Sequence, residues 1–301
     1  MQRFFLILIW STLTFTFTLT FVAASKAGDT WFADTRSTTT GLEHLTVKKL
    51  DNDNGNQSAP VWRSASLDEL LETQIPQKPL IIVIHGNWMT SAEAQKHGIA
   101  FDHLLEKFSE HQLLIWSWQS EKISCGIRLR KDALTKAQRA DDQATHLVAF
   151  LQKLKPNSKV ALIGFSFGTK LVCNTLQTLA DTKESGNELL IRSVLLAGAA
   201  DCGSLTPNGQ YRQSLSVTEK MLIHVNPDDK TLCFYPLLVR IGGPQAIGKK
   251  GASLNGLSEE SRQKIKSVNV ARQLGTEHAF TASFQSFVRC KKDFQQYALF
   301  E

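Results

Sequence analysis

A serine between two glycines is the feature of this sequence that most clearly could do chemistry. Residues 164–168 read Gly-Phe-Ser-Phe-Gly, the G-x-S-x-G pattern, and they lie between an apolar run and a stretch with helical periodicity. In that setting the pattern is typical of a nucleophile elbow, a sharp strand-to-helix turn that strains the backbone of the serine and exposes its hydroxyl group. The sequence therefore predicts that Ser166 attacks a carbonyl carbon. The alternative is a structural serine in a tight turn.

Two segments could supply the N–H groups that stabilise the negative oxygen formed in such an attack. Phe167 follows the serine directly, at the expected N-terminus of a helix. The turn His85-Gly86-Asn87-Trp88 follows another apolar run, and its glycine lets the backbone approach the reacting centre. We predict an oxyanion hole made by Phe167 with either Asn87 or Trp88, and a loop-bracing role for His85.

The elements that must position these residues alternate between strands and helices. Apolar runs of strand type occur at 79–85, 113–118, 159–165, 189–196, 221–225 and 267–270, and helical periodicity occurs at 91–108, 131–154, 167–180 and 279–299. Strands of this kind between helices indicate a parallel sheet covered on both faces. We therefore predict a three-layer αβα sandwich with a mostly parallel central sheet, built by one domain over 28–301. We also expect edge strands at 31–36 and 42–50, a short helix at 66–73 and a small cap or insertion at 235–257.

With the serine motif and the glycine turn in this order, the chain resembles the α/β-hydrolase superfamily from about Trp31 to Phe300. Segment 32–36, the turn at 85–87 and the strand end at 116–118 are loosely similar to an uncharacterised branch of exported bacterial members. The resemblance implies a serine hydrolase that cleaves a carboxylic ester or a related acyl bond through an acyl-enzyme. An amidase, a thioesterase or an acyltransferase would use the same residues, and a non-catalytic envelope protein could keep the same fold.

The superfamily's chain order of nucleophile, acid and histidine selects the remaining candidates. The register after the predicted strand 221–225 selects Asp229 as the acid, with the neighbouring Asp228 as the alternative. Asp201, one strand earlier, is a third alternative, and its other interpretation is a turn or helix-cap residue. The base is His278, between the last predicted strand and the C-terminal helix. Its imidazole would take the proton of the serine and return it to the leaving group.

The N-terminal segment predicts export. Arg3 is followed by an uncharged run from Phe4 to Ser25, with small residues suited to cleavage near its end. Met1–Ala27 is therefore predicted to be a signal peptide, and the alternative is an uncleaved membrane anchor. We expect a periplasmic, cell-envelope or secreted protein.

The composition and the net charge limit the classes of partner that the protein could bind. The 301 residues include 34 Lys and Arg against 28 Asp and Glu, a net charge of +6, and 42% of them are hydrophobic, which excludes a disordered chain. The stretch 121–139 carries six basic and two acidic residues. We expect it to form a solvated helix face, and the alternative is contact with an anionic substrate or membrane. We predict a small-molecule or lipid ester as substrate and no nucleic acid, with membrane contact only through the N-terminal segment or this stretch.

No motif in the sequence requires a cofactor or a metal. The sequence contains no HExxH motif, EF-hand loop or CxxC pair. Residues 243–250 resemble a P-loop, but Lys250 stands where a Ser or Thr hydroxyl would hold magnesium. We therefore predict neither a cofactor nor a metal.

Overall fold

The computed structural model describes residues 29–38, 41–51, 60–108, 110–123, 129–182, 188–239 and 242–301. The predicted signal peptide, Met1–Ala27, lies outside the described residues, as do residues 124–128 of the basic stretch and 240–241 of the predicted cap. Within the described ranges, no helix is both long enough and apolar enough to cross a membrane.

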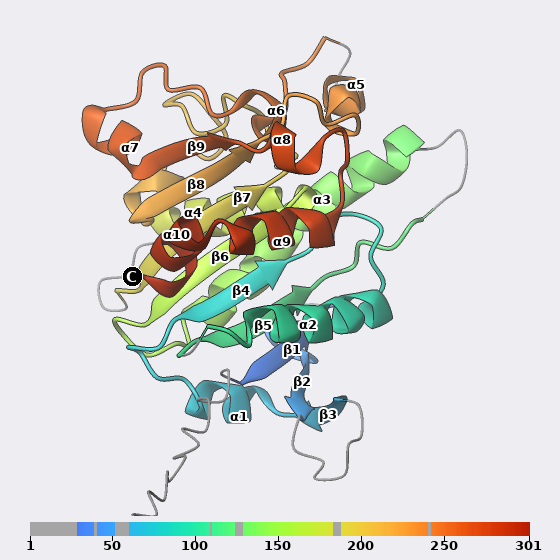
Figure 1. The fold of residues 1–301 in the computed structure, drawn as a ribbon, viewed down its shortest axis with the longest axis vertical. Helices are drawn as coiled ribbons and strands as arrows, with labels where there is room; N and C mark the ends of the chain where they lie inside the picture. Colours follow the sequence, from blue (N-terminus) through green and yellow to red (C-terminus); the bar gives the residue numbers. More distant parts are fainter. Residues whose placement is uncertain are drawn as a thin grey trace, which may run out of the picture.

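One nine-stranded sheet runs through the described part of the chain and confirms the predicted mostly parallel architecture (Figure 1). The strand order is β3-β2-β1-β5-β4-β6-β7-β8-β9. Neighbouring strands are parallel, except that β2 is antiparallel to both β1 and β3. The strands are β1 (Thr30–Asp34), β2 (Thr46–Asp51), β3 (Val61–Ala65), β4 (Leu80–Ile84), β5 (Gln112–Ser117), β6 (Lys159–Phe165), β7 (Leu190–Leu196), β8 (Lys220–Val225) and β9 (Ile265–Asn269).

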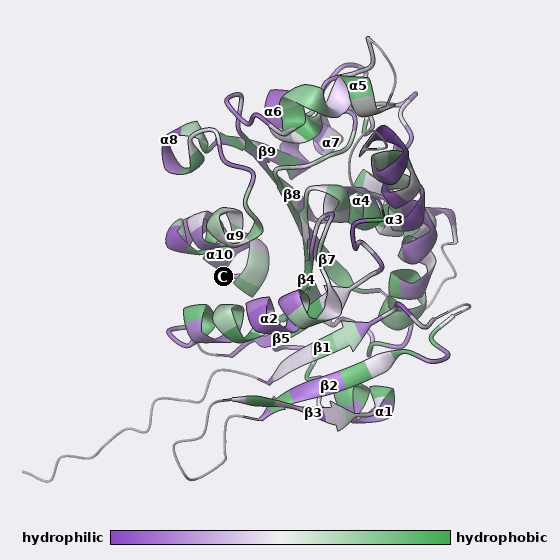
Figure 2. Cartoon of the chain, turned by 90° about the vertical axis from the view of Figure 1, so that its right-hand side faces the viewer, coloured by the Kyte–Doolittle hydropathy of each residue, from purple (hydrophilic) through white to green (hydrophobic). Residues whose placement is uncertain are grey.

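Helices cover both faces of this sheet. Four long helices do most of the covering: α2 (Ser91–Leu105), α3 (Leu129–Leu151), α4 (Phe167–Asp181) and α9 (Phe280–Arg289). Successive strand residues point to opposite faces, so Ile82 of β4 packs on the side of α3 and α4, whereas Ile81 packs on the side of α2 and α9. Figure 2 shows these two layers on either side of the strands. Burial on both faces explains why the central strands read as continuous apolar runs.

The remaining helices are shorter. They are α1 (Leu67–Glu72), α5 (Tyr235–Val239), α6 (Ile247–Lys250), α7 (Glu259–Lys264), α8 (Ala271–Leu274) and α10 (Lys291–Phe294), which continues into a π turn at Gln295–Leu299. The predicted cap, 235–257, contains α5 and α6. Ile247 of α6 is fully buried, and the N–H of Gly248 donates a 2.9 Å hydrogen bond to the carbonyl oxygen of Gly198, just after β7. The α6 part of this stretch is therefore packed into the main core.

Several elements differ from the sequence predictions, which also lack the short helices α7 and α8. The sequence does not predict β3, because this edge strand is mostly solvent-facing and its mixed composition gives no apolar run. The predicted helix 279–299 is interrupted at Cys290, whose ψ of 67° is not helical. The interruption allows Phe287 and Phe294 to pack together, with ring centroids 5.3 Å apart.

Candidate active site

Ser166 stands at the sharp turn between β6 and α4. Its φ of 52° and ψ of −118° are strained for a residue with a side chain. The turn leaves no room for larger neighbours: a Cβ on Gly164 would lie 2.6 Å from the carbonyl oxygen of Gly168, and one on Gly168 would lie 2.4 Å from that of Ile84. The two glycines of the motif are therefore required by close packing, and the turn has the geometry of a nucleophile elbow.

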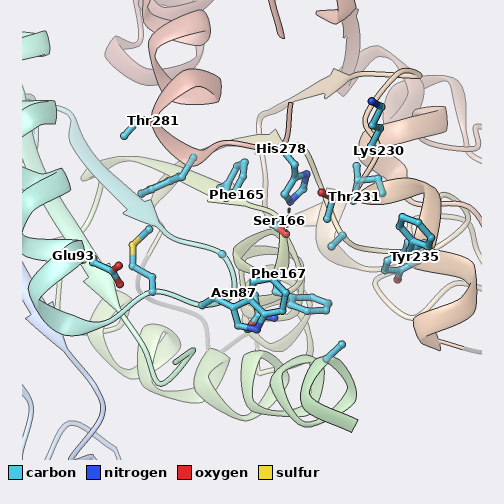
Figure 3. A pocket seen from close by; sticks show the side chains of 18 of the residues that line it. Asn87, Glu93, Phe165, Ser166, Phe167, Lys230, Thr231, Tyr235, His278 and Thr281 are labelled. Atoms are coloured by element: carbon cyan, nitrogen blue, oxygen red, sulfur yellow. Dashed lines mark hydrogen bonds between the residues drawn. The ribbon is translucent and has the colours of Figure 1, made fainter. Parts of the chain in front are cut away.

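A chain of hydrogen bonds joins three predicted residues that are far apart in the sequence. His278 Nε2 lies 3.0 Å from Ser166 Oγ, and His278 Nδ1 lies 2.7 Å from Asp229 Oδ2 (Figure 3). The Asp229 carboxylate can only accept a hydrogen bond, so His278 Nδ1 carries the proton and donates it to this bond. His278 Nε2 is then free to accept a hydrogen bond from the serine hydroxyl. This arrangement can draw a proton from Ser166 when its oxygen attacks an electrophile.

The loops that carry the acid and the histidine are held together directly. Asn226, which follows β8, donates from Nδ2 to the carbonyl oxygen of Gly275 at 2.9 Å. The Asp229 side chain is buried, and its Oδ1 accepts a 2.9 Å hydrogen bond from the N–H of Leu232. Both oxygens of this carboxylate are thus engaged, which fixes the plane in which it meets His278.

The two alternative acids lie elsewhere. Asp228 is exposed, and its backbone N–H donates to Asn226 Oδ1 at 3.1 Å. Asp201 Oδ1 accepts a 2.8 Å hydrogen bond from the Tyr235 hydroxyl. Of the three carboxylates considered from the sequence, Asp229 is the one that the structure places on His278.

The glycine turn after β4 lies against the serine. A Cβ on Gly86 would stand 2.8 Å from Ser166 Cβ. Among the described residues, the N–H groups of Asn87 and Phe167 meet no hydrogen-bond acceptor, so both are available to an oxyanion. The N–H of Trp88 donates instead to the carbonyl oxygen of Ser120 at 2.7 Å. This bond removes Trp88 from the candidate donors and leaves Asn87 with Phe167.

His85 is buried in the loop behind this turn. Its Nε2 accepts a 3.2 Å hydrogen bond from the N–H of Trp118, so Nδ1 carries the proton and donates to the carbonyl oxygen of Gly86 at 2.9 Å. Burial lowers the pKa of His85 to about 3, although the bond to Gly86 opposes this shift. The side chain is therefore neutral at ordinary pH and holds the glycine turn in place, as predicted from its position at the end of a strand.

A buried ion pair that the sequence did not predict supports the same turn from α3. Asp132 and Lys136 have no exposed side-chain surface, and Lys136 Nζ lies 3.0 Å from Asp132 Oδ1. Asp132 also accepts from Trp88 Nε1 at 2.7 Å and from the N–H of Ile123 at 2.8 Å. Burial raises the pKa of Asp132, but these hydrogen bonds outweigh burial and leave the pKa below its ordinary value.

This pair corrects part of the prediction for 121–139. Lys136 does not belong to a solvated helix face, because it lies inside the molecule and pairs with Asp132. The i, i+4 spacing of an acid and a base is the signal that was available in the sequence. That spacing is equally common on exposed helix faces, so it does not reveal burial.

Ser166 opens into a pocket of about 950 Å³. Figure 3 shows His278 and Ser166 near its centre, Glu93 and Thr281 toward one side, and Lys230, Thr231 and Tyr235 toward the other. Most of the wall is apolar and includes Phe165, Phe167, Leu232 and Phe280. In the described part of the chain, no three His, Cys, Asp or Glu side chains are grouped in a way that could hold a metal ion.

Comparison with known proteins gives one family. The model of the family described as "Alpha/beta hydrolase of unknown function (DUF900)" matches residues 63–243, a range that includes Ser166 and Asp229 and ends before His278. No curated protein matches the chain.

Solved structures of an esterase, Est2 from the Planctomycetes species Thermogutta terrifontis, are similar to this chain over much of its length. The propionate-bound form is 12% identical, with 74% of this chain and 85% of that chain covered and a TM-score of 0.30. The native form is also 12% identical, with 74% and 83% covered and a TM-score of 0.31.

Proposed function

The chain belongs to a family of α/β hydrolases of unknown function (DUF900), and we propose that it is a serine hydrolase that cleaves carboxylic esters or related acyl bonds. The observation that supports the proposal is the hydrogen-bonded series Asp229, His278 and Ser166, which ends at the strained elbow in the wall of a large apolar pocket. A merely structural serine would need neither the elbow nor the imidazole.

The proposed reaction has two steps. In the first, Ser166 Oγ attacks the ester carbonyl while His278 Nε2 takes the hydroxyl proton, and the oxyanion that forms is stabilised by the N–H groups of Phe167 and Asn87. His278 then gives the proton to the departing alcohol, and the acyl group remains on the serine. In the second step, water attacks the acyl carbonyl while His278 Nε2 takes one of its protons. The bond to Ser166 Oγ then breaks, His278 returns the proton to Ser166, and the carboxylic acid leaves.

Labelling with a fluorophosphonate tests this proposal, because the reagent forms a covalent bond with an activated serine. We expect the wild type to be labelled and Ser166→Ala not to be. Ser193→Ala is the matched control, since Ser193 is a buried serine on the neighbouring strand β7, and it should be labelled like the wild type. Equal labelling of the wild type and Ser166→Ala would overturn the proposal.

Turnover of a soluble p-nitrophenyl ester tests the assignment of the base separately. We expect His278→Ala to lose nearly all turnover, because no other imidazole is placed on Ser166 within the described residues. If this variant keeps the rate of the wild type, His278 is not the base, even if labelling supports Ser166.

A further inference from the structure

Large apolar side chains are exposed around the mouth of the pocket. We call Trp88, Ile123, Leu134, Phe234 and Leu237 the apolar rim, and their exposed fractions are 51%, 52%, 40%, 60% and 51%. Among the described residues, only three further large apolar side chains are as exposed as these: Val61, Ile75 and Leu254. Exposed apolar surface is therefore concentrated at the entrance to Ser166.

The members of the apolar rim are joined to the pocket by named contacts. Trp88, Phe234 and Leu237 line it directly. Ile123 is held beside Trp88, because the N–H of Ile123 and the indole N–H of Trp88 donate to the two oxygens of Asp132.

Leu134 on α3 and Leu237 on α5 complete the apolar rim. Leu134 lies next to the lining residue Ala133 on α3 and one turn after the lining residue Arg130. Figure 1 shows α5 beside the first turns of α3, and the two helices are in contact. Exposed apolar side chains gathered around one pocket in this way mark a surface that meets another apolar phase.

Several basic side chains without an ion-pair partner lie around the apolar rim. Lys122 Nζ stands 5.3 Å from the centre of the Trp88 ring, and both Arg130 and Lys230 line the pocket. In the described part of the chain, none of these three, nor the exposed Lys131, forms an ion pair with a carboxylate.

Most acids in the same segments are engaged. Glu121 pairs with Arg36, and Asp132 pairs with Lys136. Glu93 accepts hydrogen bonds from Thr90 in the cap of α2. Within the described residues, Asp228 is exposed beside Lys230, Glu277 is exposed beside His278, and Glu93 has no ion pair, so four basic side chains stand against three acids around the mouth.

We propose that the apolar rim and these basic residues dock the molecule on an anionic lipid bilayer, with the pocket mouth facing the lipid. Trp, Phe, Leu and Ile side chains gain free energy when they leave water for the boundary between headgroups and acyl chains. Lys and Arg beside them are attracted to anionic headgroups. The positive charge favours a bilayer over an apolar protein surface as the occupant.

The docking itself does not depend on the chemistry at Ser166. Its consequence for the substrate rests on the proposed function: if Ser166 is a nucleophile, docking would present lipid esters to it without passage through water. The experiment therefore measures docking on the Ser166→Ala chain, which cannot consume the vesicles through that serine.

Amide hydrogen exchange of full-length Ser166→Ala tests the proposal with vesicles of phosphatidylcholine alone and of phosphatidylcholine with phosphatidylglycerol in equal amounts. We expect peptides from 119–123 and 229–237 to exchange at least about threefold more slowly on the anionic vesicles, with little change on the neutral ones. Unchanged exchange of both peptides on anionic vesicles would overturn the proposal and leave a protein partner for this surface. The N-terminal segment is common to all variants, and this local measurement does not depend on whether that segment also binds lipid.

A matched pair of double variants in the same background locates the docking surface. Ile123→Ser with Leu134→Gln should weaken partitioning onto anionic vesicles by about tenfold or more, as the loss of two apolar side chains requires. Val61→Ser with Ile75→Ser should leave partitioning unchanged. These side chains are 52% and 53% exposed, but Val61 belongs to β3 and Ile75 follows α1, and Figure 1 shows both elements at the opposite end of the molecule from α5. An equal loss in both pairs would contradict the proposal.

Two further measurements separate the role of the basic residues from the proposed hydrolase activity. Lys122→Gln with Lys131→Gln should weaken partitioning by roughly tenfold on anionic vesicles and have little effect on neutral ones. Thermal unfolding shows whether each variant is folded. Wild-type turnover of a soluble ester without vesicles reports on the proposed function alone, so failure of docking and failure of the hydrolase assignment give different results.

Discussion

The indole N–H of Trp88 donates a 2.7 Å hydrogen bond to Asp132 Oδ2 and so joins the turn after β4 to the first turns of α3. The other oxygen of the same carboxylate pairs with the buried Lys136. Lys136 Nζ lies in turn 3.5 Å from Asn87 Oδ1. The residue next to the candidate oxyanion donor is thereby fastened to a buried charge pair, and the position of the turn depends on α3 as well as on its own glycine.

Breaking this charge pair should destabilise the fold. Asp132→Ala leaves the Lys136 ammonium buried without its partner, which costs about 3–5 kcal/mol in the free energy of unfolding. Urea denaturation measures the loss. Asp132→Ala combined with Lys136→Met removes both charges and should be less destabilised than Asp132→Ala alone. A double variant that loses the full sum of the two single losses would show that the charges do not interact.

The glycine turn should be intolerant of a side chain. In Gly86→Ala the new Cβ would lie 2.8 Å from Ser166 Cβ and 2.9 Å from Phe165 Cδ1, so the turn must shift and move Asn87. We expect kcat for a soluble ester to fall by about 10²–10³-fold, the effect of losing one oxyanion donor. Gly203→Ala is the control, because a Cβ there meets nothing within 4 Å. Similar rates for the two variants would exclude a role of this turn in the reaction.

Substitution of the two neighbouring carboxylates after β8 should have very different effects on kcat. Asp229→Asn offers an amide where His278 Nδ1 needs an acceptor, which disturbs the tautomer and should lower kcat by about 10³–10⁴-fold. Asp228→Asn should stay within about twofold of the wild type, because Asp228 is exposed and, among the described residues, its side chain has no hydrogen-bond partner. Steady-state kinetics on one ester compares them. The assignment of the acid is wrong if Asp228→Asn shows the larger loss.

A buried histidine outside the site should make stability depend on pH. Burial between β8 and α9 lowers the pKa of His224 to about 4, and neither ring nitrogen has a hydrogen-bond partner in the described part of the chain. The unfolded chain binds this proton below about pH 6.5, whereas the folded chain does not until about pH 4. The contribution of the neutral, buried His224 to the free energy of unfolding is therefore fully present above pH 6.5 and is lost as the pH falls toward 4.

Urea unfolding at pH 7 and pH 5 measures this contribution. Wild-type stability should fall over this interval by about 2 kcal/mol through His224 alone, at about 1.4 kcal/mol per pH unit. His85, whose pKa is lowered in the same direction, adds to the fall. In His224→Leu, the part of this fall that is due to His224 should be absent. Its free energy of unfolding at pH 7 should be no lower than that of the wild type. A pH dependence identical to that of the wild type would contradict the prediction.

The sequence alone was informative wherever a residue's role depends on its immediate neighbours. The elbow follows from the glycines on either side of Ser166, and the bracing role of His85 follows from its place at a strand end. Hydrogen bonds between distant parts of the chain, and the burial of a charged side chain, are harder to predict from the sequence. The sequence alone cannot exclude Trp88 as an oxyanion donor, because its N–H bonds to Ser120, a residue 32 positions away. It also cannot show that Lys136 is buried, because the spacing of Asp132 and Lys136 does not say which helix face is buried.

The hydrogen bond from Asn226 to Gly275 closes a loop of the chain that leaves the sheet after β8 and returns just before His278. This loop supplies Leu232, whose N–H holds the Asp229 carboxylate, and it also supplies Phe234 and Leu237, which line the pocket. The segment that shapes one wall of the pocket is therefore the segment that orients the acid. A substitution made there to change what enters the pocket acts on the position of Asp229 as well.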